Sequence, residues 1–295
     1  MSEAKFVIAL GMFDGVHIGH RALLSRAKEI ALEHGATCTV FTFSNHPLEL
    51  FDAEVRYLCT NEQRRELFLE LGMDRVDMIP FESTIAELSA EGFVELLQQR
   101  YLIDTLVVGF NYSFSKGGRG NPAALERLGN EYGFAVEVIP PVMVDDIPVS
   151  STRIRELLKE GNVIEAERLL KREYSLRGAV VPNKQLGRRI GFPTANILEG
   201  NMAIPKDGVY ATRAILDGIE IDAVTNVGTN PTVHGDKRTI ETHLIDTDAE
   251  LYGREIEIRF AGYLRGEKTF NNTEELSKQI TEDIINAKKV LKRRK

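Results

Sequence analysis

The sequence predicts an α/β domain with a doubly wound parallel sheet, followed by a small antiparallel β-barrel with a closing helix. Strand and helix patterns alternate through the first half of the chain, whereas short β-rich pieces split by Gly, Pro, Asn and Asp follow Tyr174. The length of 295 residues also suits two domains better than one hydrophobic core. We place the boundary near residue 173, so that residues 1–173 form the first domain with its linker helices and residues 174–295 form the second.

The elements of the first domain follow from two hydrophobic periods. Short apolar runs are typical of buried parallel strands, and apolar residues at helical spacing between them indicate helices that cover the sheet. Thr60 followed by Gln63 has the form of a capping box at the start of one such helix. Ligands of such sheets bind at the carboxyl ends of the strands, where we expect the site of this domain. The expected strands are residues 5–10, 37–43, 75–81, 105–110 and 135–142, and the expected helices include residues 19–34, 64–72, 89–100, 151–161 and 163–174.

The second half of the chain has the spacing of a small barrel. Its β-rich pieces are short and are interrupted by turn residues, as expected for antiparallel strands that close on themselves. From Asn272 to about Leu291, apolar residues recur at helical spacing, which predicts a helix that closes the chain. The expected strands are residues 176–181, 208–216, 221–228, 239–246 and 255–264.

The composition is that of an ordinary globular protein, with 43% hydrophobic and 27% charged residues. The longest apolar stretch near the start is far shorter than a membrane span of about 20 residues, and it lacks the features of a signal peptide. Two cysteines provide no disulfide framework, so we expect a cytoplasmic chain with no membrane partner. A net charge of −7 argues against nucleic acid as a general partner.

Two histidines, His17 and His20, stand three residues apart in the string GMFDGVHIGH, directly after the first expected strand. Core histidines are one interpretation, but the glycines beside them make it a poor one. A zinc pair is a second, since this spacing places both rings on one helical face, although no cysteine partner stands nearby. The third is phosphate recognition, because a glycine-bearing loop before a helix N-terminus lets the backbone approach an anion. Two histidines there are suited to donating hydrogen bonds to nucleotide phosphates.

A second motif, SSTRIR, lies at residues 150–155 before another expected helix. Its hydroxyls and arginines are suited to holding a triphosphate. Together, the two motifs resemble those of the HxGH nucleotidyltransferases. Class I tRNA synthetases share HxGH, but this chain lacks the size and the basic surface expected for tRNA. The resemblance implies that ATP is bound by Gly11, Phe13, Asp14, Gly15, His17, Gly19, His20, Ser151, Thr152 and Arg153.

The string GRRIGFPTANI, at residues 187–197, is the most specific in the chain. With GVY, NVGTNPT, ETHLID, LYG and LRGEKTF downstream, in matching order and spacing, it resembles riboflavin kinase. Joined to the HxGH motifs, the whole chain resembles the bacterial bifunctional riboflavin kinase/FAD synthetase family. That resemblance implies an enzyme whose second domain phosphorylates riboflavin to FMN with ATP. Its first domain would then adenylylate FMN to FAD and release pyrophosphate.

The kinase half offers residues suited to phosphoryl transfer, which depends on charge neutralisation and positioning. Thr194 and Asn196 provide neutral oxygens suited to a hydrated Mg²⁺ carried by ATP. Glu241, on an expected strand, could accept the proton of the ribityl hydroxyl, which is the role that the resemblance implies for it. The resemblance also implies flavin contacts from Arg265, Glu267 and Phe270, and ATP contacts from Gly187, Arg188, Gly191, Phe192, Pro193, Thr194 and Asn196.

In the first half, FTFSNHPLELF follows the second expected strand and is similar to a family string that receives the isoalloxazine ring. Phe43, Pro47 and Phe51 fit that role, because a planar ring favours an aromatic and apolar wall. Asn111 ends another expected strand and matches a family position near the reacting phosphates. The resemblance implies that the charge shifting onto pyrophosphate is stabilised by His17, His20, Asn111 and Arg153.

The chain departs from the family pattern at three places. Asn45 stands where the family often has Pro, the loop SKGGRG has its Arg shifted, and Pro182 and Asn183 stand where a loop glycine is usual. Because Asn tolerates positive φ better than most residues, the kinase loop can keep its shape. Two alternatives stay open: an FAD synthetase whose weakened kinase domain retains flavin binding, and a flavin-sensing regulator.

Overall fold

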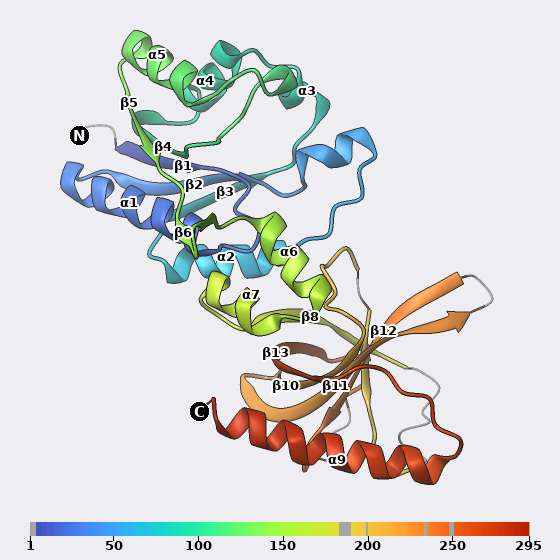
Figure 1. Ribbon diagram of the computed structural model, residues 1–295. Coiled ribbons are helices and arrows are strands. Elements are labelled where there is room, and N and C mark those ends of the chain that lie inside the picture. The colour runs from blue at the N-terminus through green and yellow to red at the C-terminus, as the bar shows by residue number, and fades with distance from the viewer. Residues whose placement is uncertain (1–3, 183–189, 199, 233–234, 248–250, 295) are drawn as a thin grey trace. The chain divides into compact units, whose positions relative to one another are not determined.

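The structure is a computed structural model that describes residues 4–182, 190–198, 200–232, 235–247 and 251–294. It divides into two compact units (Figure 1). The first comprises Met1–Arg56 and Thr60–Ser151, and the second comprises Tyr57–Cys59 and Thr152–Lys295. The division therefore falls earlier in the chain than the boundary that the sequence suggests. That boundary, near residue 173, stays a prediction.

The first unit contains the predicted parallel sheet. Its strands are β1 (Lys5–Leu10), β2 (Thr37–Phe43), β3 (Arg75–Ile79), β4 (Leu102–Gly109) and β5 (Ala135–Ile139). They lie in the order β3-β2-β1-β4-β5, and neighbours run parallel. Because the chain passes outward from β1 on one side and then returns to its other side at β4, the carboxyl ends of β1 and β4 form a topological switch point. The predicted doubly wound sheet is confirmed.

Helices cover both faces of this sheet. They are α1 (Ile18–His34), α2 (Asn61–Glu70), α3 (Ser83–Ala86), α4 (Ala90–Gln98) and α5 (Pro122–Tyr132). On β1, Val7 and Ala9 pack into the cluster that contains α1 and α2. Ile8 and Leu10 point the other way and pack into the cluster that contains α4 and α5. Figure 1 shows these two pairs of helices on opposite sides of the sheet.

Local signals account for the helix ends. The predicted capping box is present at α2, because the N–H of Gln63 donates to Thr60 Oγ1 over 3.2 Å and the N–H of Thr60 donates to the Gln63 side chain over 2.9 Å. Helix α5 was not predicted, although Asn121 caps it by accepting the N–H of Ala124 over 2.9 Å. The short elements of this unit are η1 (Pro47–Phe51), η2 (Lys116–Gly118), β6 (Met143–Val144) and β7 (Ile147–Pro148).

The second unit contains the predicted closed barrel. Its strands are β8 (Tyr174–Val181), β9 (Ala195–Ile197), β10 (Gly208–Leu216), β11 (Ile219–Thr232), β12 (Gly235–Leu244) and β13 (Glu255–Arg265). They close in the order β10-β11-β12-β9-β8-β13, with antiparallel neighbours. Strand β9 was not predicted as a strand. It forms the last three residues of the GRRIGFPTANI string and pairs with both β8 and β12, which places the end of that string in the barrel wall.

Helices precede and follow the barrel strands in the chain. They are α6 (Ser151–Glu160), α7 (Val163–Leu170) and α9 (Thr273–Lys292). The closing helix α9 is confirmed, and Asn272 caps it by accepting the N–H of Glu275 over 2.9 Å. On its inner side, Ala287 and Leu291 pack into one cluster with Val209 of β10. An apolar stripe on α9 therefore covers part of the barrel wall.

A short segment from the first half of the chain completes the second unit. The N–H of Tyr57 donates to the carbonyl of Asn201 over 2.7 Å, and the N–H of Ala203 donates to the carbonyl of Tyr57 over 2.7 Å. Leu58 and Cys59 beside it are buried. The units are therefore not continuous in sequence, which no local pattern indicated. Over the described part of the chain, no helix is long and apolar enough to cross a membrane.

Candidate active sites

The string GMFDGVHIGH forms a tight loop between β1 and α1. Two of its side-chain-bearing residues adopt positive φ, 52° at Phe13 and 42° at Val16, and Gly15 between them has 82°. Such backbone costs about 1–3 kcal/mol per residue and persists only where the surroundings hold it. The carbonyl of Phe13 accepts the N–H of Val16 over 3.1 Å, and the carbonyl of Asp14 accepts the hydroxyl of Ser151 over 2.8 Å. These bonds hold the loop in one shape.

His17 and His20 lie at the start of α1 with their rings stacked, 3.6 Å between centroids. His17 is the N-cap, and its Nδ1 accepts the N–H of His20 over 3.3 Å. Gly19 leaves room for this cap, because a Cβ on it would lie 3.2 Å from the His17 ring. Burial lowers the pKa of His20 well below its ordinary value, and the charges of His17 and Arg64 lower it further. His20 therefore carries a neutral imidazole at neutral pH.

The zinc interpretation of this pair lacks further ligands. Among the described residues, no three side chains of His, Cys, Asp or Glu are gathered as a metal ion would require. The Nδ1 atom of His20 is buried and has no hydrogen-bond partner within the described part of the chain. A ring nitrogen without a protein partner suits a group that meets a ligand.

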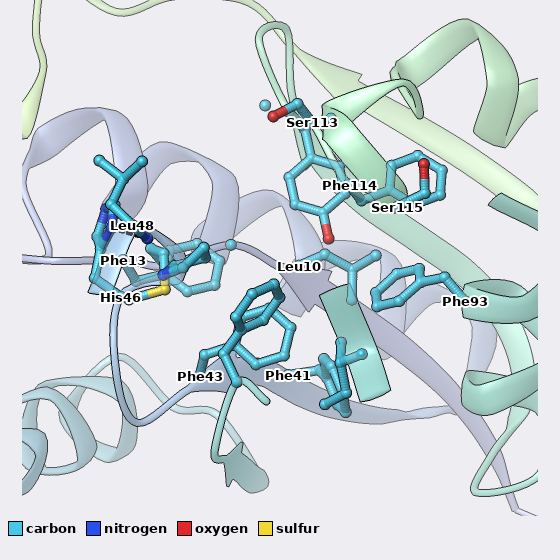
Figure 2. A pocket seen from close by; sticks show the side chains of 18 of the residues that line it. Leu10, Phe13, Phe41, Phe43, His46, Leu48, Phe93, Ser113, Phe114 and Ser115 are labelled. Atoms are coloured by element: carbon cyan, nitrogen blue, oxygen red, sulfur yellow. Dashed lines mark hydrogen bonds between the residues drawn. The ribbon is translucent and has the colours of Figure 1, made fainter. Parts of the chain in front are cut away.

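The loop opens onto a cavity of about 650 Å³ at the carboxyl ends of the strands. In Figure 2, Phe13, His46 and Leu48 lie at one end of this cavity. Phe93 and Phe114 lie at the opposite end, and Phe41 and Phe43 lie between. The predicted site residues on its wall are Gly11, Phe13, His20, Phe43, Pro47, Phe51 and Asn111. His17 is buried behind His20 and does not line the cavity.

Asn45 supports the aromatic part of this wall. Its amide nitrogen donates to the carbonyl of Phe81 over 3.1 Å, and its Oδ1 accepts the N–H of Phe81 over 2.7 Å. Phe81 packs edge-on against Phe43, 4.9 Å between ring centroids. The residue that stands in place of the family's Pro thus fixes a neighbour of the cavity by two hydrogen bonds. Phe51 is 73% exposed at the rim, so an aromatic surface is left open beside the apolar wall.

The SSTRIR motif contacts the GMFDGVHIGH loop at its second residue, Ser151. The Ser151 hydroxyl that bonds to Asp14 joins the two predicted motifs within the first unit. Thr152 and Arg153 follow in the chain on the first turn of α6, and they belong to the second unit. Asn111 lies after β4 at the switch point. The structure therefore brings together residues of both motifs that are far apart in sequence.

A second cavity, of about 300 Å³, lies in the barrel unit. Asn196 of β9 lies opposite Glu241 of β12, and Glu241 lies opposite Asn226 of β11. Residues directly opposite in antiparallel strands share one face, so these polar side chains are neighbours. The predicted residues that line the cavity are Phe192, Thr194, Glu241, Arg265, Glu267 and Phe270. Gly191 and Pro193 precede β9, whereas Asn183, Gly187 and Arg188 lie outside the described residues.

Asp283 and His243 are two of the lining residues of this cavity that the sequence analysis did not name. Asp283 of α9 is 3% exposed and accepts hydrogen bonds from Arg265 at both carboxylate oxygens, over 2.9 and 2.7 Å. His243 of β12 contacts the carbonyl of Pro193 through Nδ1 over 2.9 Å. The sequence carries a signal for each. His243 stands two residues after Glu241 on one strand face, and Asp283 interrupts the apolar stripe of its helix.

The fold and the two cavities define a transferase of two parts, a parallel-sheet nucleotidyltransferase unit with an HxGH loop and a barrel unit of riboflavin kinase type. The comparisons with known proteins agree. The family model of FAD synthetase matches residues 1–153, and that of riboflavin kinase matches residues 170–291. The chain belongs to the family of bifunctional riboflavin kinase/FMN adenylyltransferases. It matches curated members of that family over nearly their whole length.

Individual relatives span both units. The bifunctional riboflavin kinase/FMN adenylyltransferase of Escherichia coli (strain K12) is 36% identical over 287 residues, which cover 96% of this chain and 91% of that protein. The protein of the same description from Bacillus subtilis (strain 168) is 35% identical over 290 residues, covering 95% and 91%. A crystal structure described as a macrolide-efflux protein from Streptococcus pneumoniae has a TM-score of 0.87 and 28% identity, covering 96% of this chain and 93% of that one.

Proposed function

We propose that this chain converts riboflavin to FMN in the barrel unit and FMN to FAD in the parallel-sheet unit, with ATP as the donor in both steps. The observation that carries the second step is the cavity of about 650 Å³, whose wall combines the HxGH loop, Asn111 and an aromatic surface. A flavin nucleotide needs both a polar place for its phosphate and an apolar place for its ring. Cys38 and Cys59, the two cysteines of the chain, are buried thiols rather than a disulfide, which favours a reducing compartment such as the cytoplasm.

In the adenylyl transfer, a phosphate oxygen of FMN attacks the α-phosphorus of ATP. The bond from that phosphorus to the β-phosphate oxygen breaks, and negative charge grows on the departing pyrophosphate. His20, a neutral imidazole at the start of α1, donates a ring N–H to this charge. His17 holds the backbone of His20 in place, and the N-terminus of α1 itself favours an anion. Asn111 supplies a further donor for the phosphates, and the resemblance to the family implies the same role for Arg153.

The isoalloxazine ring of FMN belongs at the aromatic part of the cavity. Phe43 presents an aromatic face there, and Phe81 fixes the angle of that face. Pro47 and the exposed Phe51 lie at the rim, where a planar ring would cover them. The flavin therefore supplies the apolar contact that the open rim lacks, and its phosphate reaches toward His20.

In the kinase step, the ribityl hydroxyl of riboflavin attacks the γ-phosphorus of ATP while a carboxylate oxygen of Glu241 accepts the hydroxyl proton. The bond to the bridging oxygen breaks and ADP leaves. Mg²⁺ bound with ATP supplies charge neutralisation for the transferred phosphoryl group. The amide of Asn196, 8% exposed and opposite Glu241, and the hydroxyl of Thr194 fit the preference of Mg²⁺ for oxygen ligands and would hold it.

The test is to incubate the full chain with riboflavin, ATP and Mg²⁺ and to separate the flavins over time. We expect FMN first and FAD after it. His20→Ala should lower FAD formation by about 10²–10³, the usual cost of one transition-state donor, while FMN accumulates. His34→Ala is a matched control, because His34 ends the same helix and is 46% exposed. Near wild-type FAD formation by His20→Ala would refute the assignment, and absence of FMN from riboflavin would leave an FAD synthetase with an inactive kinase.

A further inference from the structure

Arg64 lies on α2 with its guanidinium wholly inside the first unit. Its side chain is 0% exposed and is the largest fully buried one in the described part of the chain. Nη1 donates to the carbonyl of Met12 over 2.7 Å, and Nη2 donates to the carbonyl of Phe43 over 2.8 Å. Nη2 also donates to the side chain of Asn61 on the same helix. A buried cation is costly unless such bonds compensate for the lost water.

The two carbonyls belong to different parts of the cavity wall. Met12 lies in the HxGH loop, Phe43 lies on the aromatic wall, and both line the cavity. Arg64 is not among the lining residues, so it lies behind the wall. A guanidinium is planar and its donors have fixed directions, so binding both carbonyls fixes one relative to the other. The only other bond given to the Met12 carbonyl by the described residues comes from Thr42 Oγ1 and is longer, 3.3 Å.

We propose that Arg64 is a positioning residue for adenylyl transfer, which fixes the phosphate-binding loop relative to the flavin wall without touching either substrate. This inference rests on the proposed FMN adenylyltransferase activity. Phe13, next to Met12, keeps a φ of 52°, and such a backbone relaxes when its anchor is removed. A displacement of about 1 Å at the reacting groups lowers the rate by roughly 10²-fold.

Arg64 also acts on His20 through its charge. The titratable groups that face His20 are His17 at the start of α1 and Arg64 on α2, and the ring of Phe13 contacts it edge-on. Burial is the main cause of the low pKa of His20, and the charges of His17 and Arg64 add to it. Removal of the Arg64 charge should therefore raise the pKa of His20. A role limited to packing would not produce that change.

The experiment compares Arg64→Met, Arg64→Lys and Arg65→Met in the full chain. Arg65 is the next residue of α2 and is exposed, so Arg65→Met removes the same charge without the buried bonds. For each protein, kcat and KM are measured for FAD formation from FMN and ATP. Riboflavin phosphorylation by the same sample reports that the barrel unit is intact, and NMR follows the titration of His20.

We expect Arg64→Met to lower kcat for FAD formation by about 10²-fold and to raise the titration midpoint of His20. Arg64→Lys keeps the positive charge but loses the planar guanidinium that binds both carbonyls. It should therefore lower kcat less than Arg64→Met and leave the titration midpoint of His20 near that of the wild type. Arg65→Met should change neither. FAD formation by Arg64→Met within about twofold of the wild type overturns the inference.

Two further outcomes separate the possible failures. If Arg64→Met does not fold, an Arg64→Lys protein with the wild-type thermal midpoint and wild-type kcat overturns the inference instead. If the wild type forms no FAD, the proposed function fails. An unchanged His20 titration in Arg64→Met would then overturn the electrostatic part of the inference independently.

Discussion

Glu241 stands on β12 between Asn196 on one neighbouring strand and Asn226 on the other. A single glutamate on a strand is more often a solvated surface residue, and only the surrounding motif pointed to a general base. The structure adds the neighbours. Its carboxylate lies between two amides at the wall of a cavity that Thr194 also lines, which fits the proposed role of general base. At the residue scale, the surroundings of a side chain decide its chemistry.

The replacement Glu241→Gln removes the base and keeps the shape of the side chain. We expect FMN formation from riboflavin to fall by about 10²–10⁴ in kcat, because proton acceptance is lost in the transition state. The KM values for riboflavin and ATP should change little, since binding in the ground state is kept. Steady-state kinetics of riboflavin phosphorylation measure both constants. FAD formation from added FMN is the control in the same sample, and a wild-type kcat for FMN would exclude Glu241 as the base.

Residues such as Arg64 and Asp283 show the limit of pattern reading. Both occupy helix positions on an apolar stripe, Arg64 beside Leu67 and Phe68 on α2. A charged residue on an apolar stripe departs from the hydrophobic pattern. This departure is the signal in the sequence that could have pointed to each of the two residues. Its meaning depends on partners elsewhere in the chain, such as Met12, which local spacing does not identify.

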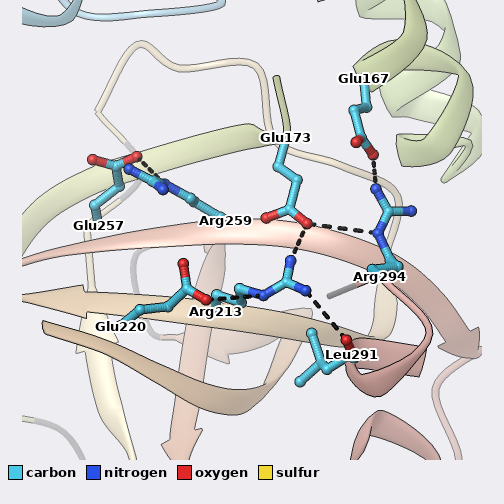
Figure 3. Close-up of polar contacts among 8 residues, drawn as sticks. All are labelled: Glu167, Glu173, Arg213, Glu220, Glu257, Arg259, Leu291 and Arg294. Atoms are coloured by element: carbon cyan, nitrogen blue, oxygen red, sulfur yellow. Dashed lines mark hydrogen bonds and ion pairs between the residues drawn. The ribbon is translucent and has the colours of Figure 1, made fainter. Parts of the chain in front are cut away.

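At the scale of elements, Glu173 joins the linker to the barrel and to the closing helix (Figure 3). Arg213 of β10 pairs with Glu173 and with Glu220, and it donates to the carbonyl of Leu291 at the end of α9 over 3.3 Å. Arg294 also lies near Glu173, at 3.6 Å. Arg294 pairs as well with Glu167 of α7, so α7 groups with the barrel unit although the sequence places it before the change of periodicity.

Loss of the Glu173 carboxylate should destabilise the second unit. The Arg213 side chain is 7% exposed, and breaking a buried pair costs about 3–5 kcal/mol. Because Arg213 keeps Glu220 and the Leu291 carbonyl, we expect Glu173→Ala to cost about 3 kcal/mol, the low end of that range. The control is Glu255→Ala, since Glu255 is 70% exposed and such surface pairs contribute little. Denaturant unfolding measures both, and equal effects would contradict the argument.

At the scale of the whole chain, each unit has its own core, but the division in sequence is interrupted. Tyr57–Cys59 belongs to the second unit and bonds to Asn201 and Ala203. The helices before the barrel belong to that unit and carry the buried residues Leu158, Leu169 and Leu170. Since each fully buried leucine contributes about 1.5–3 kcal/mol, the barrel depends on residues before 174.

Fragments test this dependence. Residues 1–173 and 174–295 remain the predicted folding units, and the structure adds an expectation about their stability. A fragment of residues 152–295 should unfold at higher denaturant than residues 174–295, because it keeps α7 and Glu173. Both should be less stable than the barrel in the full chain, which retains Tyr57–Cys59. Denaturant unfolding, monitored by the loss of riboflavin phosphorylation, measures the order of the three stabilities. Equal stability of the two fragments would contradict the expectation.

Short-range patterns in the sequence determined the two fold types, most strand and helix positions, the capping box at Thr60 and both nucleotide motifs. They could do so because periodicity, caps and glycine-bearing loops are local properties of the chain. Only the tertiary structure decided that Phe43, Asn111 and His20 share one cavity, that Arg64 anchors the loop, and that Tyr57–Cys59 completes the other unit. The physical reason is that burial and pairing of polar groups depend on partners distant in sequence, and a buried charge is stable only where the whole fold supplies those partners.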